Sequence, residues 1–183
     1  MTINNKRKKQ PEIVRATLLR CAKTLAVRGG LSAISVQAVC DEAGVTKGAF
    51  FHHFENKDAL LKCVFEQMLT DYSNEIDRLI SADPFEKGAF TRAYLEQGFA
   101  TLKNAGLMTL WKSAMDDEYI CSRWRDWYQG MLKKRGDLDD NPQLTLVRLA
   151  ADGLCLSLSM QIAQGEPDNL IAALRQMASL PLK

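Results

Sequence analysis

Paired cysteines are missing from this chain of 183 residues. Its five cysteines stand at positions 21, 40, 63, 121 and 155, and no two of them form a CxxC pair. An odd number of scattered cysteines argues against a closed disulfide framework. The basic residues Lys6 to Lys9 are followed by no apolar run, so we expect no secretory leader. A reduced, cytoplasmic protein is the simplest interpretation.

Signals for β-structure are also missing. No useful length of chain alternates apolar and polar residues, and no hairpin turn pair joins two such stretches. Internal repeats and low-complexity tracts are absent. Because every convincing periodicity is helical, the sequence predicts an all-α protein of about nine helices.

Motifs for catalysis and for metal binding are not found either. There is no Ser-His-Asp order, phosphate loop, dinucleotide fingerprint or metal-ligand cluster. The adjacent His52 and His53 point about 100° apart on a helix and lack a ligand four residues later. We therefore expect no enzyme, no cofactor and no metal site.

Residues 144–162 are apolar on nearly every side but contain Arg148, Asp152 and Gln161, so they are too broken to span a membrane. Such a helix must be covered all round, and a second subunit is the obvious cover in a short chain. We expect a homodimer with an interface of Leu149, Leu156, Met160, Leu170, Leu174 and Met177. Within the helix, Arg148 stands one turn before Asp152 and is its predicted partner.

The net charge of +2 is unevenly distributed. Residues 1–62 hold 11 Lys and Arg against 5 Asp and Glu, a net charge of +6, whereas residues 63–183 hold 13 against 17, a net charge of −4. A basic N-terminal third on an acidic body indicates that one end of the protein meets a polyanion.

Residues 35–58 are the most informative stretch. Ser35 and Thr46 are N-cap residues before two short helices, and Gly44 between them suits a left-handed turn. Asn56 then caps a long fourth helix. Two short helices joined by a tight turn are the layout of a helix-turn-helix that reads DNA.

Flanking helices follow from similar signals. The first is predicted to begin near Pro11 and to end at Gly29. Asp83-Pro84-Phe85-Glu86 has the order of a capping box, so a fifth helix is predicted to begin there. Residues 137–140 are read as a polar loop, and the last two helices are predicted from Pro142 and from Pro167.

From Val14 to Leu60 the chain resembles the TetR family of bacterial transcriptional regulators. The resemblance rests on Leu18-Leu19, Ala22, Leu25, Gly30, Ser35-Val36, Ala43-Gly44-Val45-Thr46-Lys47-Gly48, Phe51-His52-His53-Phe54, Lys57 and Leu60. It implies a three-helix DNA-binding domain at residues 10–56 and a helical effector-binding and dimerisation domain at residues 57–183. It also implies a ligand-responsive regulator, usually a repressor that binds a pseudo-palindromic operator as a dimer.

The N-terminal turn of the second short helix suits DNA contact. Lys47 can reach phosphate or a guanine edge, and the small Gly48 and Ala49 allow a close approach. The predicted DNA-binding residues are Ser35, Gln37, Thr46, Lys47, Gly48, Ala49, Phe51, His52 and Lys57. The family usually has Tyr where this chain has Phe51, so a phosphate hydrogen bond is lost there. Lys6 to Lys9 form either a minor-groove arm or a solvated tail.

The body is rich in methionine and aromatic residues, and all three tryptophans lie between residues 99 and 131. By resemblance, the family keeps its small-molecule pocket among these helices, and such side chains suit an apolar or aromatic effector. The alternative is that they fill the core. The candidate pocket residues are Phe99, Met108, Trp111, Met115, Tyr119, Trp124, Trp127, Tyr128 and Cys155.

Two other interpretations remain open. Arg123 and Arg125 stand close to Cys121, so a redox- or electrophile-sensing regulator acting through Cys121 or Cys155 is one alternative. A helix-turn-helix that binds a protein partner is the other, and the positive charge of residues 1–62 disfavours it.

Overall fold

The computed structural model describes residues 4–160, 162 and 167–179, and every element among them is a helix. The predicted all-α fold is therefore confirmed for the described chain. The chain divides into two compact units, one of residues 1–69 and 109–121 and the other of residues 70–108 and 122–183. The expected functional boundary near residue 56 stays a prediction, since a compact unit is not a functional domain.

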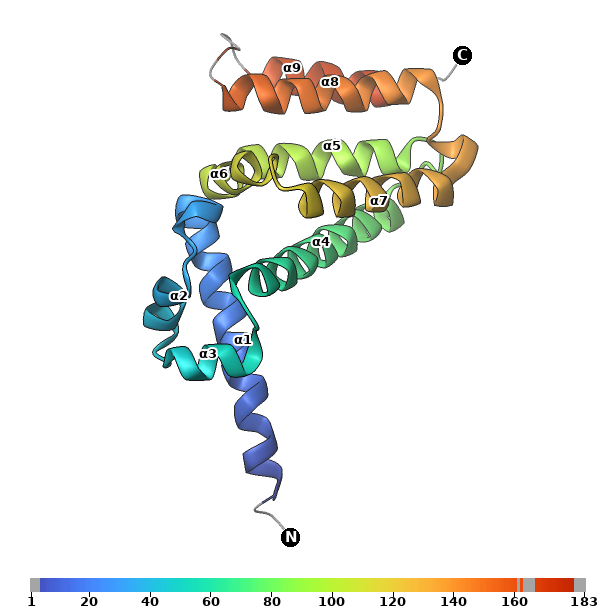
Figure 1. Cartoon of the computed structure of the whole chain (residues 1–183). Coiled ribbons are helices and arrows are strands. Elements are labelled where there is room, and N and C mark those ends of the chain that lie inside the picture. Colours follow the sequence, from blue (N-terminus) through green and yellow to red (C-terminus); the bar gives the residue numbers. More distant parts are fainter. Residues whose placement is uncertain (1–3, 161, 163–166, 180–183) are drawn as a thin grey trace. The chain divides into compact units, whose positions relative to one another are not determined.

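The first unit is built on α1 (Asn4–Gly29), with α2 (Val36–Ala43) and α3 (Lys47–His53) packed against it (Figure 1). The predicted start of α1 at Pro11 is wrong, because the helix begins at Asn4 and passes through the proline. The ring holds φ in the helical range and removes only one backbone donor. Lys6 to Lys9 fall in this added segment, and their side chains lie outside the described residues.

The backbone after α1 lies very close to the Ser113 side chain. Gly30 has a φ of 70°, and a Cβ there would lie 2.9 Å from the Ser113 hydroxyl. Ser113 in turn accepts a hydrogen bond from the Leu31 amide at 3.0 Å. Glycine at this position therefore lets the short 3-10 helix after α1 (Leu31–Ala33) contact α6 (Ala105–Ala114).

The remaining helices have clear ends. They are α4 (Lys57–Ala82), α5 (Ala89–Leu102), α6 (Ala105–Ala114), α7 (Glu118–Arg135), a 3-10 turn (Gly136–Leu138), α8 (Pro142–Ser159) and α9 (Pro167–Ser179). None of the helices in the described ranges is long and apolar enough to cross a membrane.

The predicted capping box at Asp83 is wrong, because α5 begins only at Ala89. The Asp83 carboxylate does accept the Phe85 amide at 2.9 Å, but it is also held by the Arg92 guanidinium at 2.7 and 3.0 Å. A side chain one turn into α5 thus ties residues 83–88 into a turn. Gly88, with a φ of 78°, then redirects the chain into the helix.

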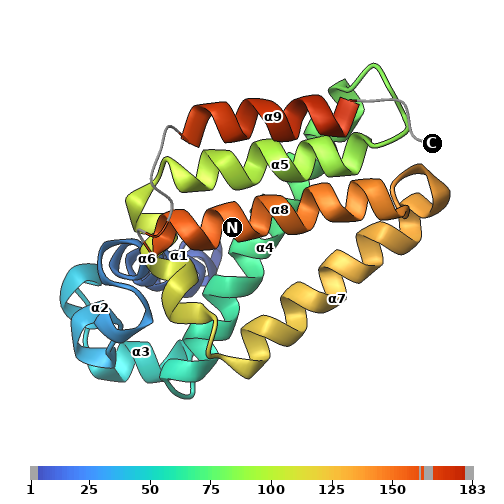
Figure 2. The ribbon, with the colours of Figure 1, turned by 90° about the horizontal axis from the view of Figure 1, so that it is seen from above.

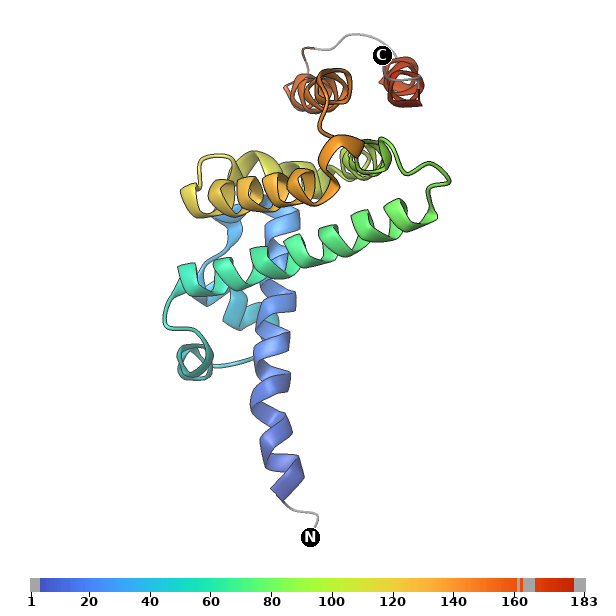
Figure 3. The same cartoon turned by 90° about the vertical axis from the view of Figure 1, so that its right-hand side faces the viewer.

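In the second unit, α5, α8 and α9 run alongside one another, as Figure 2 shows from above and Figure 3 shows along the helix axes. Their shared core is apolar and consists of Leu95, Phe99, Val147, Ala151, Leu154, Ile171, Leu174 and Ala178. Leu174, a predicted dimer residue, is only 7% exposed in the single chain because it fills this core. Phe99, a candidate effector residue, is 2% exposed and also fills this core.

A polar network is buried in this unit. The Arg148 side chain is 1% exposed, and it donates hydrogen bonds to Tyr128, Thr91, Thr145 and the Asp139 carbonyl. Asp152 is not among its hydrogen-bond or ion-pair partners, so the predicted Arg148–Asp152 pair is wrong. Tertiary partners from three other segments outcompete the helical neighbour.

Asp139 forms the other half of this network. The reading of residues 137–140 as a polar loop misses that Asp139 is 0% exposed. Its carboxylate accepts the amides of Phe90 and Thr91 and an Arg135 guanidinium donor at 3.3 Å. The loop before α8 is therefore anchored to the first turn of α5 by buried charge.

Candidate nucleic-acid interface

The turn between α2 and α3 follows the sequence expectation closely. Ser35 accepts the Ala38 amide at 3.0 Å, and Thr46 accepts the Ala49 amide at 3.2 Å. Gly44 between the helices has a φ of 65°, in the left-handed region. Asn56 caps α4 through the Ala59 amide at 2.8 Å. The three N-caps predicted within residues 35–58 are therefore confirmed.

One face of α3 is exposed and the other is buried. Thr46, Lys47 and Gly48 are exposed at its N-terminus, and Phe51 is 53% exposed. Phe50 is fully buried, so it anchors the opposite face in the core. The first turn of α3 therefore presents a cation and a small backbone to solvent.

The other predicted DNA-binding residues lie around this turn. Ser35, Gln37 and His52 are exposed, and Ala49 and Lys57 are half-buried. Gln37 donates a 2.7 Å hydrogen bond to Asp41 one turn later, so its amide is engaged along its own helix. If Gln37 contacts DNA as predicted, its side-chain amide must exchange the hydrogen bond to Asp41 for one to the DNA.

The two histidines differ in environment. His52 is exposed, whereas burial lowers the pKa of His53 below its usual value, with the charges of His52 and Arg15 acting in the same direction. A neutral His53 fits a structural role. Within the described segments, no three His, Cys, Asp or Glu side chains come together as a metal site.

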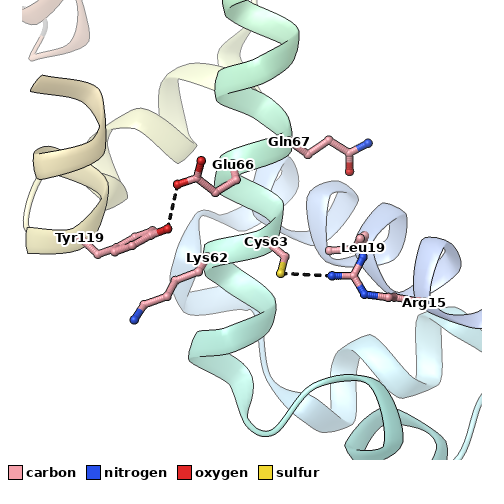
Figure 4. A pocket seen from close by; sticks show the side chains of 7 residues that line it. All are labelled: Arg15, Leu19, Lys62, Cys63, Glu66, Gln67 and Tyr119. Carbon is pink, nitrogen blue, oxygen red and sulfur yellow. Dashed lines mark hydrogen bonds between the residues drawn. The ribbon is translucent and has the colours of Figure 1, made fainter. Parts of the chain in front are cut away.

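A hollow of about 430 Å³ lies in the first unit between α1, α4 and the start of α7 (Figure 4). No sequence pattern indicates this hollow, because its lining comes from three separated segments. The lining residues are Arg15, Leu19, Lys62, Cys63, Glu66, Gln67 and Tyr119. Tyr119, a candidate effector residue, donates its hydroxyl to Glu66 at 2.8 Å here.

An aromatic cluster lies in the second unit. Three candidate effector residues, Trp124, Trp127 and Tyr128, pack with Tyr72, Phe90 and Tyr94. The Tyr72 ring centroid is 5.1 Å from that of Trp124 and 5.2 Å from that of Trp127, both edge-on. The buried Trp127 indole Nε1 has no hydrogen-bond partner among the described residues.

Asp152 reaches this cluster from α8. Its carboxylate accepts the Tyr94 hydroxyl at 2.8 Å. Partial burial raises the pKa of Asp152 above its usual range, against the lowering effects of the Tyr94 hydrogen bond and the Arg148 charge. The aromatic cluster thus carries one acidic group at its edge and one unsatisfied donor inside it.

The remaining candidate effector residues do not gather at this cluster. Met108 and Trp111 are half-buried, Met115 is 59% exposed, and Trp111 and Met115 belong to the first unit. Cys155 is half-buried on α8. The candidate effector residues therefore do not line one common pocket but lie in several different environments.

The cysteine alternative receives no support from these surroundings. Burial, followed by the Asp152 charge, raises the pKa of the Cys155 thiol to about 11. The Cys121 thiol donates to the Met115 carbonyl at 3.2 Å, and Arg123 is paired with Asp126 instead. Neither thiol has the electropositive setting of a sensing cysteine.

An apolar stripe remains exposed on α8 and α9. Leu149, Leu156 and Met160 are 60%, 47% and 59% exposed, and Leu170 and Met177 are 51% and 44% exposed. All five are candidate dimer residues, and on each helix they recur at spacings of about one or two turns.

These features define a class of protein. Two short capped helices joined by a left-handed glycine, with the second helix presenting an exposed cationic first turn, form a helix-turn-helix DNA-binding unit. The model for bacterial regulatory proteins of the tetR family matches residues 18–64, and the tetracyclin repressor-like C-terminal domain matches residues 88–180. The chain belongs to the TetR family of transcriptional regulators, which are not enzymes.

Known relatives agree with this assignment. The HTH-type transcriptional repressor KstR2 of Rhodococcus jostii is 30% identical over 82 residues, which cover 45% of this chain and 38% of that protein. The aligned segments span 27–39% of the length of the first curated relatives that the chain matches.

Solved structures share the whole fold. SCO4454, a TetR-family regulator from Streptomyces coelicolor, has a TM-score of 0.69 and 15% identity, with 97% of this chain and 93% of that chain covered. RolR in complex with resorcinol has a TM-score of 0.57 and 18% identity, with 96% and 98% covered. At such identities the likeness concerns the fold alone.

Proposed function

We propose that this regulator is a repressor that binds a pseudo-palindromic operator as a homodimer and is released by a small apolar or aromatic effector. The observation that carries the proposal is the exposed first turn of α3, where Thr46, Lys47 and Gly48 face solvent and Phe50 is buried behind them. The name of the relative KstR2 as a repressor supports the direction of control. Such a regulator would act on the chromosome in the cytoplasm.

The exposed stripe of α8 and α9 supports the dimer. Leucine and methionine side chains left half-open on two adjacent helices form a surface that a second copy would cover. Four helices, two from each chain, would then pack around a two-fold axis. In such a dimer, the two α3 helices would read successive major grooves, which lie about 34 Å apart.

The aromatic cluster of the second unit supports the effector. Its rings offer flat apolar walls, and the unsatisfied Trp127 indole can donate to an acceptor on a bound molecule. RolR, which shares the fold, was solved with the small phenol resorcinol. A ligand that binds one arrangement of the body more tightly would shift the population of DNA-competent dimers.

Genome-wide selection of bound DNA fragments, at about 150 mM salt, tests this function through Lys47→Ala. We expect the unmodified protein to recover a palindrome and the variant to bind it about 5- to 150-fold more weakly, since one lost base or phosphate contact is worth roughly 1–3 kcal/mol. Lys87→Ala, a change of an exposed lysine in the turn before α5, is the matched control and should leave affinity unchanged. Sequence-blind binding by both proteins would contradict the proposal.

Phe51→Tyr tests the departure from the family pattern. Phe51 is 53% exposed on α3, so an added hydroxyl can reach solvent or a phosphate without disturbing the core. We expect the variant to bind the recovered operator about 2- to 10-fold more tightly, because a net hydrogen bond is worth about 0.5–1.5 kcal/mol. Fluorescence anisotropy with a labelled duplex measures this. Unchanged or weaker binding would show that residue 51 does not face the phosphate backbone.

A further inference from the structure

The hollow of the first unit has the size of a small-molecule site. Its volume of about 430 Å³ falls within the range of known ligand pockets, about 300–1,000 Å³. Arg15 and Leu19 line it from α1, Lys62 and Glu66 from α4, and Tyr119 from the start of α7 (Figure 4). The proposed function uses none of these residues for DNA contact.

Two cations at this hollow lack a carboxylate partner within the described ranges. The Arg15 guanidinium donates to the Cys63 sulfur at 3.4 Å, and sulfur is a weak acceptor. The Lys62 ammonium lies 4.8 Å from the centroid of the Tyr119 ring. The one carboxylate of the lining, Glu66, already accepts the Tyr119 hydroxyl. The hollow therefore keeps a net positive charge and a guanidinium whose donors are mostly unused.

We propose that this hollow binds a small organic anion, namely a carboxylate carried on a flat apolar body. Arg15 supplies the planar fork that matches a carboxylate, and Lys62 adds positive potential. Leu19 and the ring of Tyr119 supply apolar surface for the body of the ligand.

Binding there would act directly on the DNA-reading unit. The Arg15 guanidinium also lies over the Phe54 ring, 5.1 Å from its centroid, and Phe54 is the buried residue that ends α3. A carboxylate that draws Arg15 toward the hollow removes this cation–π contact. The anion would thus change the support of α3 independently of the effector proposed for the second unit, and the inference goes beyond the proposed function.

Titration of the full-length protein with benzoate, followed by saturation-transfer NMR, tests the proposal. We expect a Kd on the order of 1 mM that weakens with salt, and binding of the neutral isostere benzamide at least tenfold weaker. Arg15→Gln should weaken benzoate binding at least tenfold, and Arg15→Lys, which keeps the charge but not the fork, should lie between. Arg20→Gln, a change of an exposed arginine on α1 outside the hollow, should leave binding unchanged.

Three outcomes would overturn the proposal. Equal binding of benzoate and benzamide would show that the charge is not recognised, and equal binding by the Arg15→Gln and Arg20→Gln variants would place the anion elsewhere. The third outcome combines two results: the protein does not bind benzoate, and Arg15→Gln binds non-operator duplex DNA more weakly and with less dependence on salt. This combination would assign the Arg15 cation to the DNA interface. Thermal melting of each variant confirms that it folds, and operator selection reports separately on the proposed function.

Discussion

Arg148→Met is expected to lower the free energy of unfolding by about 3–5 kcal/mol, the usual effect of breaking a buried charge network. Methionine nearly preserves the volume, so the loss would come from the polar contacts. The variant removes donors from Tyr128, Thr91, Thr145 and the Asp139 carbonyl, all at a site 1% exposed. Urea unfolding followed by circular dichroism measures the change.

The matched control is Arg175→Met. Arg175 also forms a bidentate pair, with Glu96, but about half of its side chain is exposed, so the same substitution should cost less than about 1 kcal/mol. Near-equal effects of the two substitutions would show that the buried network does not stabilise the second unit more than a surface pair does. A cost of the predicted size for Arg148→Met alone would identify the network as the link between α5, α8 and the loop before α8.

The double substitution Leu149→Glu and Leu156→Glu is expected to convert the proposed dimer to a monomer and to weaken operator binding at least a hundredfold, about 2.7 kcal/mol. Both side chains are about half exposed or more in the single chain, so the charges should leave its fold intact. In a dimer they would be buried opposite their own copies, where unpaired carboxylates are strongly unfavourable. A monomer also loses the second half-site, and with it half of the DNA contacts.

Sedimentation equilibrium and titration of the recovered operator together measure this prediction. Phe85→Glu is the control, since Phe85 is 69% exposed in the turn before α5 and lies outside the proposed interface. A double variant that remains dimeric would place the interface on another surface. A monomeric variant with full operator affinity would instead show that one chain suffices for recognition.

Local hydrogen bonding explains which elements could be predicted. The caps at Ser35, Thr46 and Asn56 depend on an amide three residues later, so a short window of sequence contains the whole interaction. Asp83 has an equally good local pattern, but Arg92 lies nine residues away and holds its carboxylate. The start of α5 therefore differs from the sequence prediction because of a tertiary contact.

The candidate sites also divide into one that local sequence predicts and others that depend on tertiary contacts. The exposed first turn of α3 follows from helical spacing once Phe50 is taken as a core residue. The aromatic cluster could not be assembled in the same way, because Tyr72 and Phe90 reach it from α4 and α5. Arg15 and Tyr119 both line the hollow, but they are about a hundred residues apart in the sequence. No periodicity connects them.

By itself, the sequence determined the helical class, the helix-turn-helix and the family, since these depend on periodicity, caps and a glycine turn within a short stretch. Only the tertiary structure decided which side of α8 is covered, because the covering helix α5 comes from a distant part of the chain and nothing in the sequence of α8 specifies the face that packs on α9. It also decided that Arg148 bonds across the core to Thr91, Tyr128 and the Asp139 carbonyl, and to Thr145 on its own helix, but not to Asp152. A buried charge takes whichever donors and acceptors the fold brings within reach, and spacing along one helix cannot specify them.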